Sequence, residues 1–268
     1  MVATSISLVQ ALNQYPELWV LTPVGYPNAP ADKAKAPYRP NWQSEEPIHR
    51  SQLANIAVHG EMVTYTKDDG STYQTARKPT GWGVRSGSIS GGLLLVDFDG
   101  AAALTKFVEL SGGIMPPVTL GFTSCTVERL ATFELPERFQ LAFQVPEKYW
   151  SAMKNRRVFK TGVFGSDGKE QILELRWDGC QSLLPSSLHP SGRIYSWLPG
   201  RHSTSVAIAS ADSKEWRWLI EALLEDLTEA TTAPPCLPLS DNTDASSQEI
   251  VIPESVLTSG SRLHSKTL

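Results

Sequence analysis

Apolar residues recur along this chain with two different periods, and each period predicts one kind of element. A spacing of three or four residues predicts helices, whereas alternation or a short apolar run predicts strands. Helical spacing is found at residues 5–15, 51–58, 101–110, 146–154 and 213–228. Strand patterns, besides the apolar run before Asp97, are found at residues 18–24, 81–85, 118–123, 138–145, 172–177, 182–184 and 194–198. Few long helices connect these strands, so an α+β fold is expected rather than a doubly wound sheet.

The last part of the chain differs from the rest. Beyond Ala230 the residues are mainly Thr, Pro, Ser and Asn, without a regular apolar period. Such a composition cannot bury enough apolar surface to fold and is typical of linkers and disordered tails. We therefore expect one folded domain over residues 1–230 and a flexible tail over residues 231–268.

Two carboxylates follow a buried strand in the middle of the chain. The run GGLLLVDFDG at residues 91–100 places Asp97 and Asp99 two positions apart, where the strand emerges. Side chains two apart on a strand point to the same face, so these oxygens lie side by side. A hard divalent cation such as Mg²⁺ takes oxygen ligands and offsets the repulsion between two such acids. The alternative interpretation is an Asp-Gly turn with both acids solvated.

Composition limits the class of protein. The chain has 268 residues, 41% of them hydrophobic, with eight tryptophans, so it can bury a substantial core. Its three cysteines are scattered and include no Cys-x-x-Cys pair, which argues against a disulfide framework or a zinc ribbon. There is no run of 18 apolar residues and no recognisable secretory signal, so we expect a soluble, cytoplasmic protein that does not enter membranes.

The formal net charge of −4 conceals an uneven distribution. Between Arg138 and His202, ten basic residues oppose five acidic ones, and between Ser203 and Leu268, ten acidic residues oppose four basic ones. A basic middle segment suits a polyanionic partner, although charge runs are often only solvated faces.

A third acid lies on a later strand pattern. In QILELRWDG, residues 171–179, Glu174 alternates with Leu173 and Leu175, and Arg176 shares its face. Such a pair could be only a surface ion pair, which contributes little to stability. If this strand lies beside the one that carries Asp97, the three acids form a cup for one or two Mg²⁺ or Mn²⁺ ions, and Arg176 meets substrate phosphates.

These motifs, taken in order, carry a family resemblance. The segments are GWGVRSG (81–87), LLVDFDG (94–100), LELRWDG (173–179) and LPSSLHPSG (184–192), with KAPY (35–38) and Trp42 before them. Over residues 18–198 the chain resembles the bifunctional primase-polymerase (prim-pol) branch of the archaeo-eukaryotic primase superfamily. The resemblance implies an archaeo-eukaryotic primase-like core with an RRM-like antiparallel sheet and flanking helices.

The resemblance also implies a reaction and its participants. It predicts a DNA primase-polymerase of plasmid or mobile-element replication, with Mg²⁺ or Mn²⁺ as cofactor, two ions being expected. Asp97, Asp99 and Glu174 take the place of the family's metal ligands. The expected partners are single-stranded or primed DNA, nucleoside triphosphates and a helicase on the same or another chain. The chemistry is attack of a 3′-hydroxyl on the α-phosphate, with the protein supplying position and charge neutralisation.

The chain departs from the family pattern at one position. Gln140 stands where the family often has a histidine that contacts nucleotide phosphates, and a glutamine brings hydrogen bonds but no charge. Arg138 could supply the missing charge. The predicted nucleotide contacts, each with a competing structural interpretation, are Arg85, Ser86, Gly87, Arg138, Gln140, Lys160, Arg176 and His189.

Other classes of protein compete with this interpretation. A HAD-type phosphatase also has Asp-x-Asp-Gly at a strand end, but Ala101 follows here in place of the usual Thr or Ser. A catalytically inactive nucleic-acid or nucleotide-binding module of the same fold is consistent with Gln140 and the acidic net charge. A P-loop NTPase is disfavoured because the sequence contains no Gly-x-x-x-x-Gly-Lys-Ser/Thr.

Overall fold

The apolar run before Asp97 forms the central strand of a large sheet. In the computed structural model, which describes residues 7–224, this strand is β5 (Leu93–Asp99). Within that range β5 pairs antiparallel with β7 (Arg138–Gln144) on one side and with β9 (Glu170–Arg176) on the other. The sheet has the order β11-β6-β7-β5-β9-β8, and β12 pairs with β7. Its remaining strands are β6 (Gly121–Thr123), β8 (Arg156–Phe164), β11 (Ser196–Trp197) and β12 (Ala209–Ser210).

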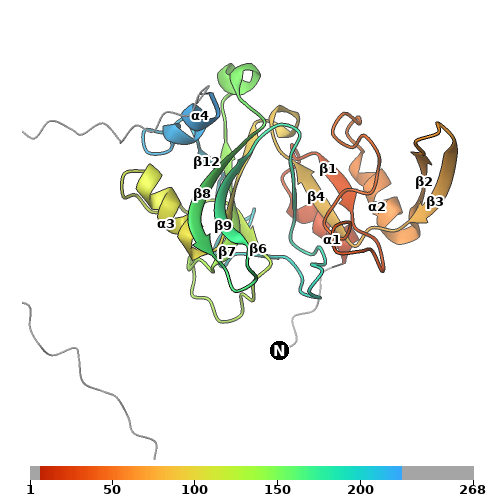
Figure 1. Cartoon of the computed structure of the whole chain (residues 1–268), viewed down its shortest axis with the longest axis horizontal. Coiled ribbons are helices and arrows are strands. Elements are labelled where there is room, and N and C mark those ends of the chain that lie inside the picture. The colour runs from red at the N-terminus through yellow and green to blue at the C-terminus, as the bar shows by residue number, and fades with distance from the viewer. Residues whose placement is uncertain (1–6, 225–268) are drawn as a thin grey trace, which may run out of the picture. The chain divides into compact units, whose positions relative to one another are not determined.

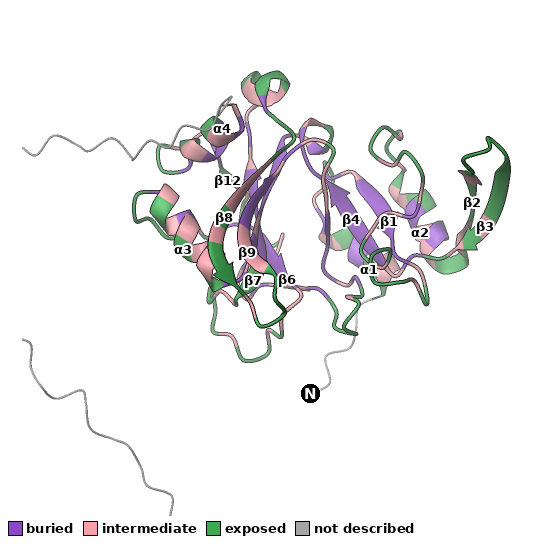
Figure 2. Ribbon diagram, in the orientation of Figure 1, coloured by how far each residue is buried: buried purple, intermediate pink, exposed green. Residues whose placement is uncertain are grey.

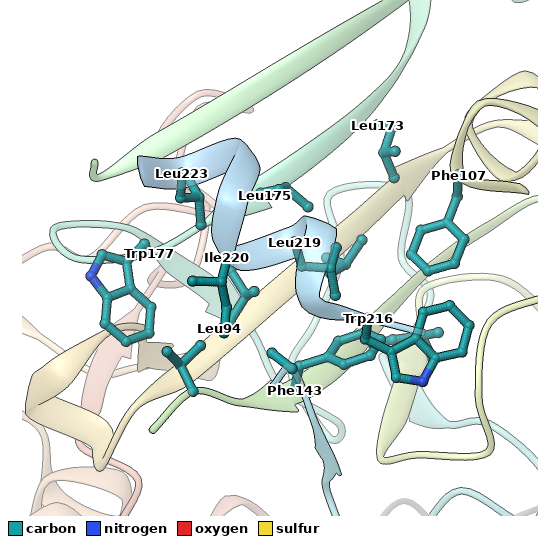
Figure 3. Packing of buried hydrophobic residues seen from close by; sticks show 14 of the residues in the cluster. Leu94, Phe107, Phe143, Leu173, Leu175, Trp177, Trp216, Leu219, Ile220 and Leu223 are labelled. Carbon is teal, nitrogen blue, oxygen red and sulfur yellow. The ribbon is translucent and has the colours of Figure 1, made fainter. Parts of the chain in front are cut away.

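One face of this sheet is apolar along its whole length. Two helices cover it, α3 (Ala101–Leu110) and α4 (Arg217–Leu224), as Figure 1 shows. The α4 side chains of Leu219, Ile220 and Leu223 point toward the sheet and are at most 1% exposed (Figure 3). Burial of each such side chain stabilises the fold by about 1.5–3 kcal/mol. This cluster packs against one face of β5 and so fixes the position of that strand.

The opposite face of the sheet is apolar at one end and charged at the other. On β5, Leu93 and Leu95 belong to a second buried cluster with Trp82 and Val84 from the N-terminal part of the chain. Two residues further along the same face comes Asp97, where this apolar cover ends. On one face of β5, Leu93 and Leu95 therefore belong to the hydrophobic core, and Asp97 belongs to the charged end of the sheet.

The N-terminal part of the chain supplies that cover. A three-stranded sheet runs in the order β1-β4-β10, with helices α1 and α2 beside it (Figure 1). These elements, with the short turns of 3₁₀ helix between them, are α1 (Leu8–Ala11), η1 (Leu12–Gln14), β1 (Leu21–Val24), α2 (Arg50–His59), β4 (Gly81–Arg85), η2 (Ser88–Ser90) and β10 (Gln181–Leu183). Figure 2 shows that their strands are buried. Strand β10 comes from the C-terminal half of the chain, so this small sheet contains strands from both halves.

The expected α+β class is confirmed, and several elements match their predicted bounds. The predicted strand at 81–85 is β4 and the predicted helix at 101–110 is α3. The primase-like core and the RRM-like sheet stay predictions. The start of the first predicted helix, the end of the last one and the tail after residue 230 lie outside the described residues.

Some elements differ from the sequence-based expectation. The hairpin of β2 (Glu61–Thr66) and β3 (Thr72–Arg77) is not among the predicted strands, because its Thr-rich strands are largely exposed and lack a clear apolar period (Figure 2). Strand β8 was also not predicted. The expected helix at 146–154 is a shorter 3₁₀ helix, η3 (Glu147–Ala152), which begins after extended Pro146. Tertiary packing decides these short elements more than local sequence does.

Among the helices of residues 7–224, none has both the length and the apolar character needed to cross a membrane.

A matched pair of phenylalanine substitutions tests the role of the helical layer. Phe107 on α3 is fully buried and contacts Phe98, Trp216 and Trp218. We expect Phe107→Ala to lower the free energy of unfolding by about 3–5 kcal/mol, because it leaves a cavity in this core. Urea unfolding followed by circular dichroism measures the change.

Phe164→Ala is the control, since Phe164 is 65% exposed and its truncation is expected to change stability by less than about 0.5 kcal/mol. Equal losses for the two variants would contradict the assigned core.

Candidate active site

The charged end of the sheet carries acids on neighbouring strands in register. Asp97 on β5 lies opposite Glu174 on β9 and opposite Gln140 on β7. Residues directly opposite in an antiparallel pair have close Cβ atoms, so these side chains share one patch of surface. Leu173 and Leu175 face the helices, which sends Glu174 to the site face. The alternation read from the sequence is therefore the cause of this convergence.

A single arginine joins two of the three acids. Arg176 Nη2 lies 2.6 Å from Asp97 Oδ2 and 2.8 Å from Glu174 Oε2, and its Nη1 donates to Ser182 Oγ at 3.0 Å. Burial by itself would lower the pKa of Arg176, but the two carboxylates outweigh it and raise the pKa. Burial raises the pKa of Asp97, and the attraction of Arg176 opposes that rise. The guanidinium therefore offsets part of the cost of placing two carboxylates side by side.

Two further arginines complete the charge balance. Arg156 on β8 pairs with Glu174, and Arg138 Nε lies 3.0 Å from Asp99 Oδ1. Arg138 also reaches the carboxylate of Asp167 at 3.3 Å. Glu174 is only 5% exposed, so its two arginine partners are what make its burial tolerable.

The three acids and their arginine partners line one cavity of about 490 Å³. A loop from the N-terminal part of the chain closes one side with Lys35 and Trp42, and His189 and Tyr195 line it as well. Burial lowers the pKa of Lys35, whereas Asp97 and Asp99 raise it. Within residues 7–224 the Lys35 ammonium forms no ion pair, so it is available to an anion.

Gln140 and His189 also line this cavity, and each has a defined hydrogen-bonding state. The Gln140 side chain donates to Asp97, which leaves its buried Oε1 without a partner among the described residues. An open acceptor suits a hydroxyl, an amine or a water rather than a phosphate oxygen. His189 Nδ1 accepts from the Ser191 backbone N–H at 3.1 Å, so its neutral form carries the proton on Nε2. Burial lowers the pKa of His189 and so favours this neutral form.

The structure brings four of the predicted nucleotide contacts together with the acids, namely Arg138, Gln140, Arg176 and His189. It places Arg85 and Ser86 in a neighbouring cavity, and Gly87 packs against Asp178. Lys160 lies on β8, exposed and outside the lining of the main cavity. The roles of these residues as nucleotide contacts stay predictions.

Sequence reasoning did not assign a role to Lys35, Trp42 or Arg156. A signal was present for the first two, in the KAPY segment and the tryptophan that follows it. No comparable signal existed for Arg156, because β8 itself was not predicted.

Asp97, Asp99 and Glu174 are also the predicted metal ligands. Within residues 7–224 no set of three or more His, Cys, Asp and Glu side chains is arranged so that it could hold a metal ion. Asp97 and Glu174 converge on one cationic group, while Asp99 faces another. The three-carboxylate cup therefore stays a prediction.

Comparison with known families agrees with the motif order. The family described as "Bifunctional DNA primase/polymerase, N-terminal" matches residues 11–214. The chain belongs to the Prim-Pol family. Membership in this DNA primase/polymerase family implies DNA and nucleotides as substrates. A search of curated proteins gave no significant match.

The shared guanidinium leads to a stability prediction for this Prim-Pol domain. We expect Arg176→Met to lower the free energy of unfolding by about 3 kcal/mol at neutral pH, because Asp97 and Glu174 lose their common partner. Adding Asp97→Asn and Glu174→Gln to that variant should recover most of the loss. Urea unfolding of the single and triple variants measures both effects.

The control is Arg193→Met, since Arg193 is exposed and its loss should cost less than about 0.5 kcal/mol. The interpretation fails if Arg176→Met is no more destabilising than this control.

Proposed function

We propose that this chain catalyses template-directed nucleotidyl transfer, making or extending DNA primers with Mg²⁺ or Mn²⁺. The observation that carries the proposal is the gathering of Asp97, Asp99 and Glu174 on one cavity that also holds Lys35 and several arginines. Membership in the Prim-Pol family supports it. The same membership motivates a role in plasmid or mobile-element replication, with a helicase on this or another chain as partner.

Two of the three acids support the proposed binding of a divalent cation. Asp97 and Glu174 place one oxygen each within 2.8 Å of the same nitrogen, so both carboxylates already converge on one cationic group. Mg²⁺ in enzymes is commonly held by one or two carboxylates together with substrate phosphates. Asp97 and Glu174 would therefore hold the first ion, and Asp99 would join them or hold a second. The ions would supply charge stabilisation to the attacking and leaving oxygens.

The other side chains bind and orient the substrate. In the proposed reaction a primer 3′-hydroxyl attacks the α-phosphate of the bound nucleotide, and the bond to pyrophosphate breaks. Lys35 and Arg138 would neutralise the triphosphate, and the His189 Nε2–H would donate to it. Gln140 would hold Asp97 in position through its side-chain hydrogen bond. These fixed charges need no reorganisation during the reaction.

Two other functions were considered. Glu174, rather than a second pair of aspartates, accompanies Asp97, which favours a polymerase over a HAD-type phosphatase. The observation that favours a non-catalytic nucleotide-binding module is that each of the three acids is ion-paired with arginine. An extension assay separates that module from a polymerase, because a module that only binds extends no primer.

Replacement of the aspartates tests the proposed function. We expect Asp97→Ala and Asp99→Ala each to reduce nucleotide incorporation on a primed template by at least about 100-fold, because charge at the reacting phosphates is lost. Gel-based extension with Mn²⁺ and dNTPs measures this, and circular dichroism should show an unchanged fold.

The matched control is Asp68→Ala in the turn of the β2–β3 hairpin, which should retain full incorporation. Incorporation at wild-type rates by both site variants would refute the assignment.

A neighbouring pair of lysines tests the phosphate site. Lys35→Ala should weaken the binding of both dATP and tripolyphosphate about tenfold or more, since a hydrogen bond to a charged group contributes about 1.5 kcal/mol or more. Titration calorimetry in the presence of Mg²⁺ measures both affinities.

Lys33→Ala is the control, because Lys33 lies two residues away with a side chain 62% exposed. Equal affinities for the two variants would remove Lys35 from the site.

A further inference from the structure

Trp42 is placed differently from the other tryptophans of the chain. All eight lie within residues 7–224, and seven belong to one of the two hydrophobic clusters or pack against it. Trp42 belongs to neither cluster, and no ring, cation or hydrogen-bond partner contacts its indole among the described residues. An indole left half-buried forgoes part of the stabilisation that its burial would give. Its ring face is therefore available to something other than the core.

The Trp42 side chain stands where two cavities meet. It lines the main cavity of about 490 Å³ and also a second cavity of about 280 Å³. Gly179 and Cys180 line both cavities as well, so the two are neighbours along this wall. A ligand that fills the main cavity can extend past the indole into the second one.

The backbone that follows Trp42 is held by hydrogen bonds. The Arg85 guanidinium donates to the carbonyl of Glu45 at 2.6 Å and to that of Gln43. The Gln43 side-chain amide donates to the Gly179 carbonyl at 2.8 Å. These bonds tie the loop to β4 and to the turn after β9, which holds the indole in place before any ligand arrives. Preorganisation of this kind lowers the entropic cost of binding.

The two cavities differ in free charge. Lys35 and three arginines line the main one. In the second, the charged groups of the lining are Arg85, which is occupied by two carbonyls, and Asp178, which accepts from the Ser88 N–H and hydroxyl at 2.8 and 3.1 Å. This cavity offers no uncommitted charge to a phosphate. It suits a flat, uncharged group that stacks on an aromatic ring.

We propose that Trp42 is the stacking platform for a nucleobase, whose edge enters the cavity lined by Arg85, Ser86, Ser88, Ile89 and Asp178. This inference rests on the proposed function, because it assigns the charged cavity to phosphates and the neighbouring one to the base. The base belongs either to the incoming nucleotide or to the template strand. Stacking is tolerant of sequence, since every base has a flat π-face.

Binding measurements on Trp42→Ala test this assignment. The ligands are dATP, tripolyphosphate and a short single-stranded oligonucleotide, each measured by titration calorimetry with Mg²⁺. We expect the affinity for a base-containing ligand to fall about tenfold, within the range measured for one base–aromatic stack, and that for tripolyphosphate to stay within about twofold. Trp42→Phe, which keeps a flat ring, should retain most of the affinity.

Tyr73→Ala is the matched control, since Tyr73 is an exposed aromatic on the β2–β3 hairpin, outside both cavities. It should leave all three affinities unchanged.

Each outcome decides the inference. A selective loss for dATP places the base of the incoming nucleotide on Trp42, and a selective loss for the oligonucleotide places a template base there. Unchanged affinities overturn the inference and leave the phosphate site intact. An equal loss for tripolyphosphate also overturns it, because Trp42 would then act on the phosphate site and not on a base. If the wild-type protein binds none of the three ligands, the proposed function itself fails.

Discussion

The bridge from Arg176 to Asp97 and Glu174 is the interaction on which the site depends. Register places these two carboxylates opposite each other on adjacent strands, where water is largely excluded. Without a shared cation the two carboxylates would repel each other. The guanidinium offsets this repulsion at contact distances of 2.6 and 2.8 Å. The sheet can therefore carry Asp97 and Glu174 next to residues that belong to the hydrophobic core.

The change from core to site along one face has a simple structural origin. The helices α3 and α4 pack against the far face of the sheet, and their buried side chains form one cluster with those of β5. The N-terminal part of the chain covers the near face only as far as Leu95. Beyond that point a loop, rather than a layer of side chains, faces the strands. Its Lys35 and Trp42 become walls of a cavity instead of parts of the core.

The features that sequence could predict are those with a local cause. The apolar run before Asp97 predicts a buried strand, and the alternation around Glu174 predicts that this acid faces away from the core. The contact between Asp97 and Glu174 could be predicted only if their two strands were assumed to be neighbours. Which strands pair is not set by local sequence. Strand β8 escaped prediction, and with it Arg156, the second partner of Glu174.

Arg85 has a structural role that its sequence motif did not predict. Its position at the end of β4 predicted a contact to a nucleotide. In the structure its guanidinium is committed to two backbone carbonyls of the 43–45 loop, and it is 6% exposed. No sequence pattern announces a side chain that binds backbone from a segment some 40 residues earlier. A structural role of this kind still serves the site, since it fixes the loop that carries Trp42.

The uneven distribution of free charge gives the two cavities different selectivities. Phosphate groups are favoured where Lys35 and the arginines converge, because their charge is only partly neutralised by the three acids. An uncharged planar group loses little by leaving water and gains contact with an aromatic face. A molecule with an anionic end and a flat apolar end would therefore bind in one orientation. That orientation would direct its phosphates toward Asp97 and Glu174, so the order of the cavities itself would align the substrate with the acids.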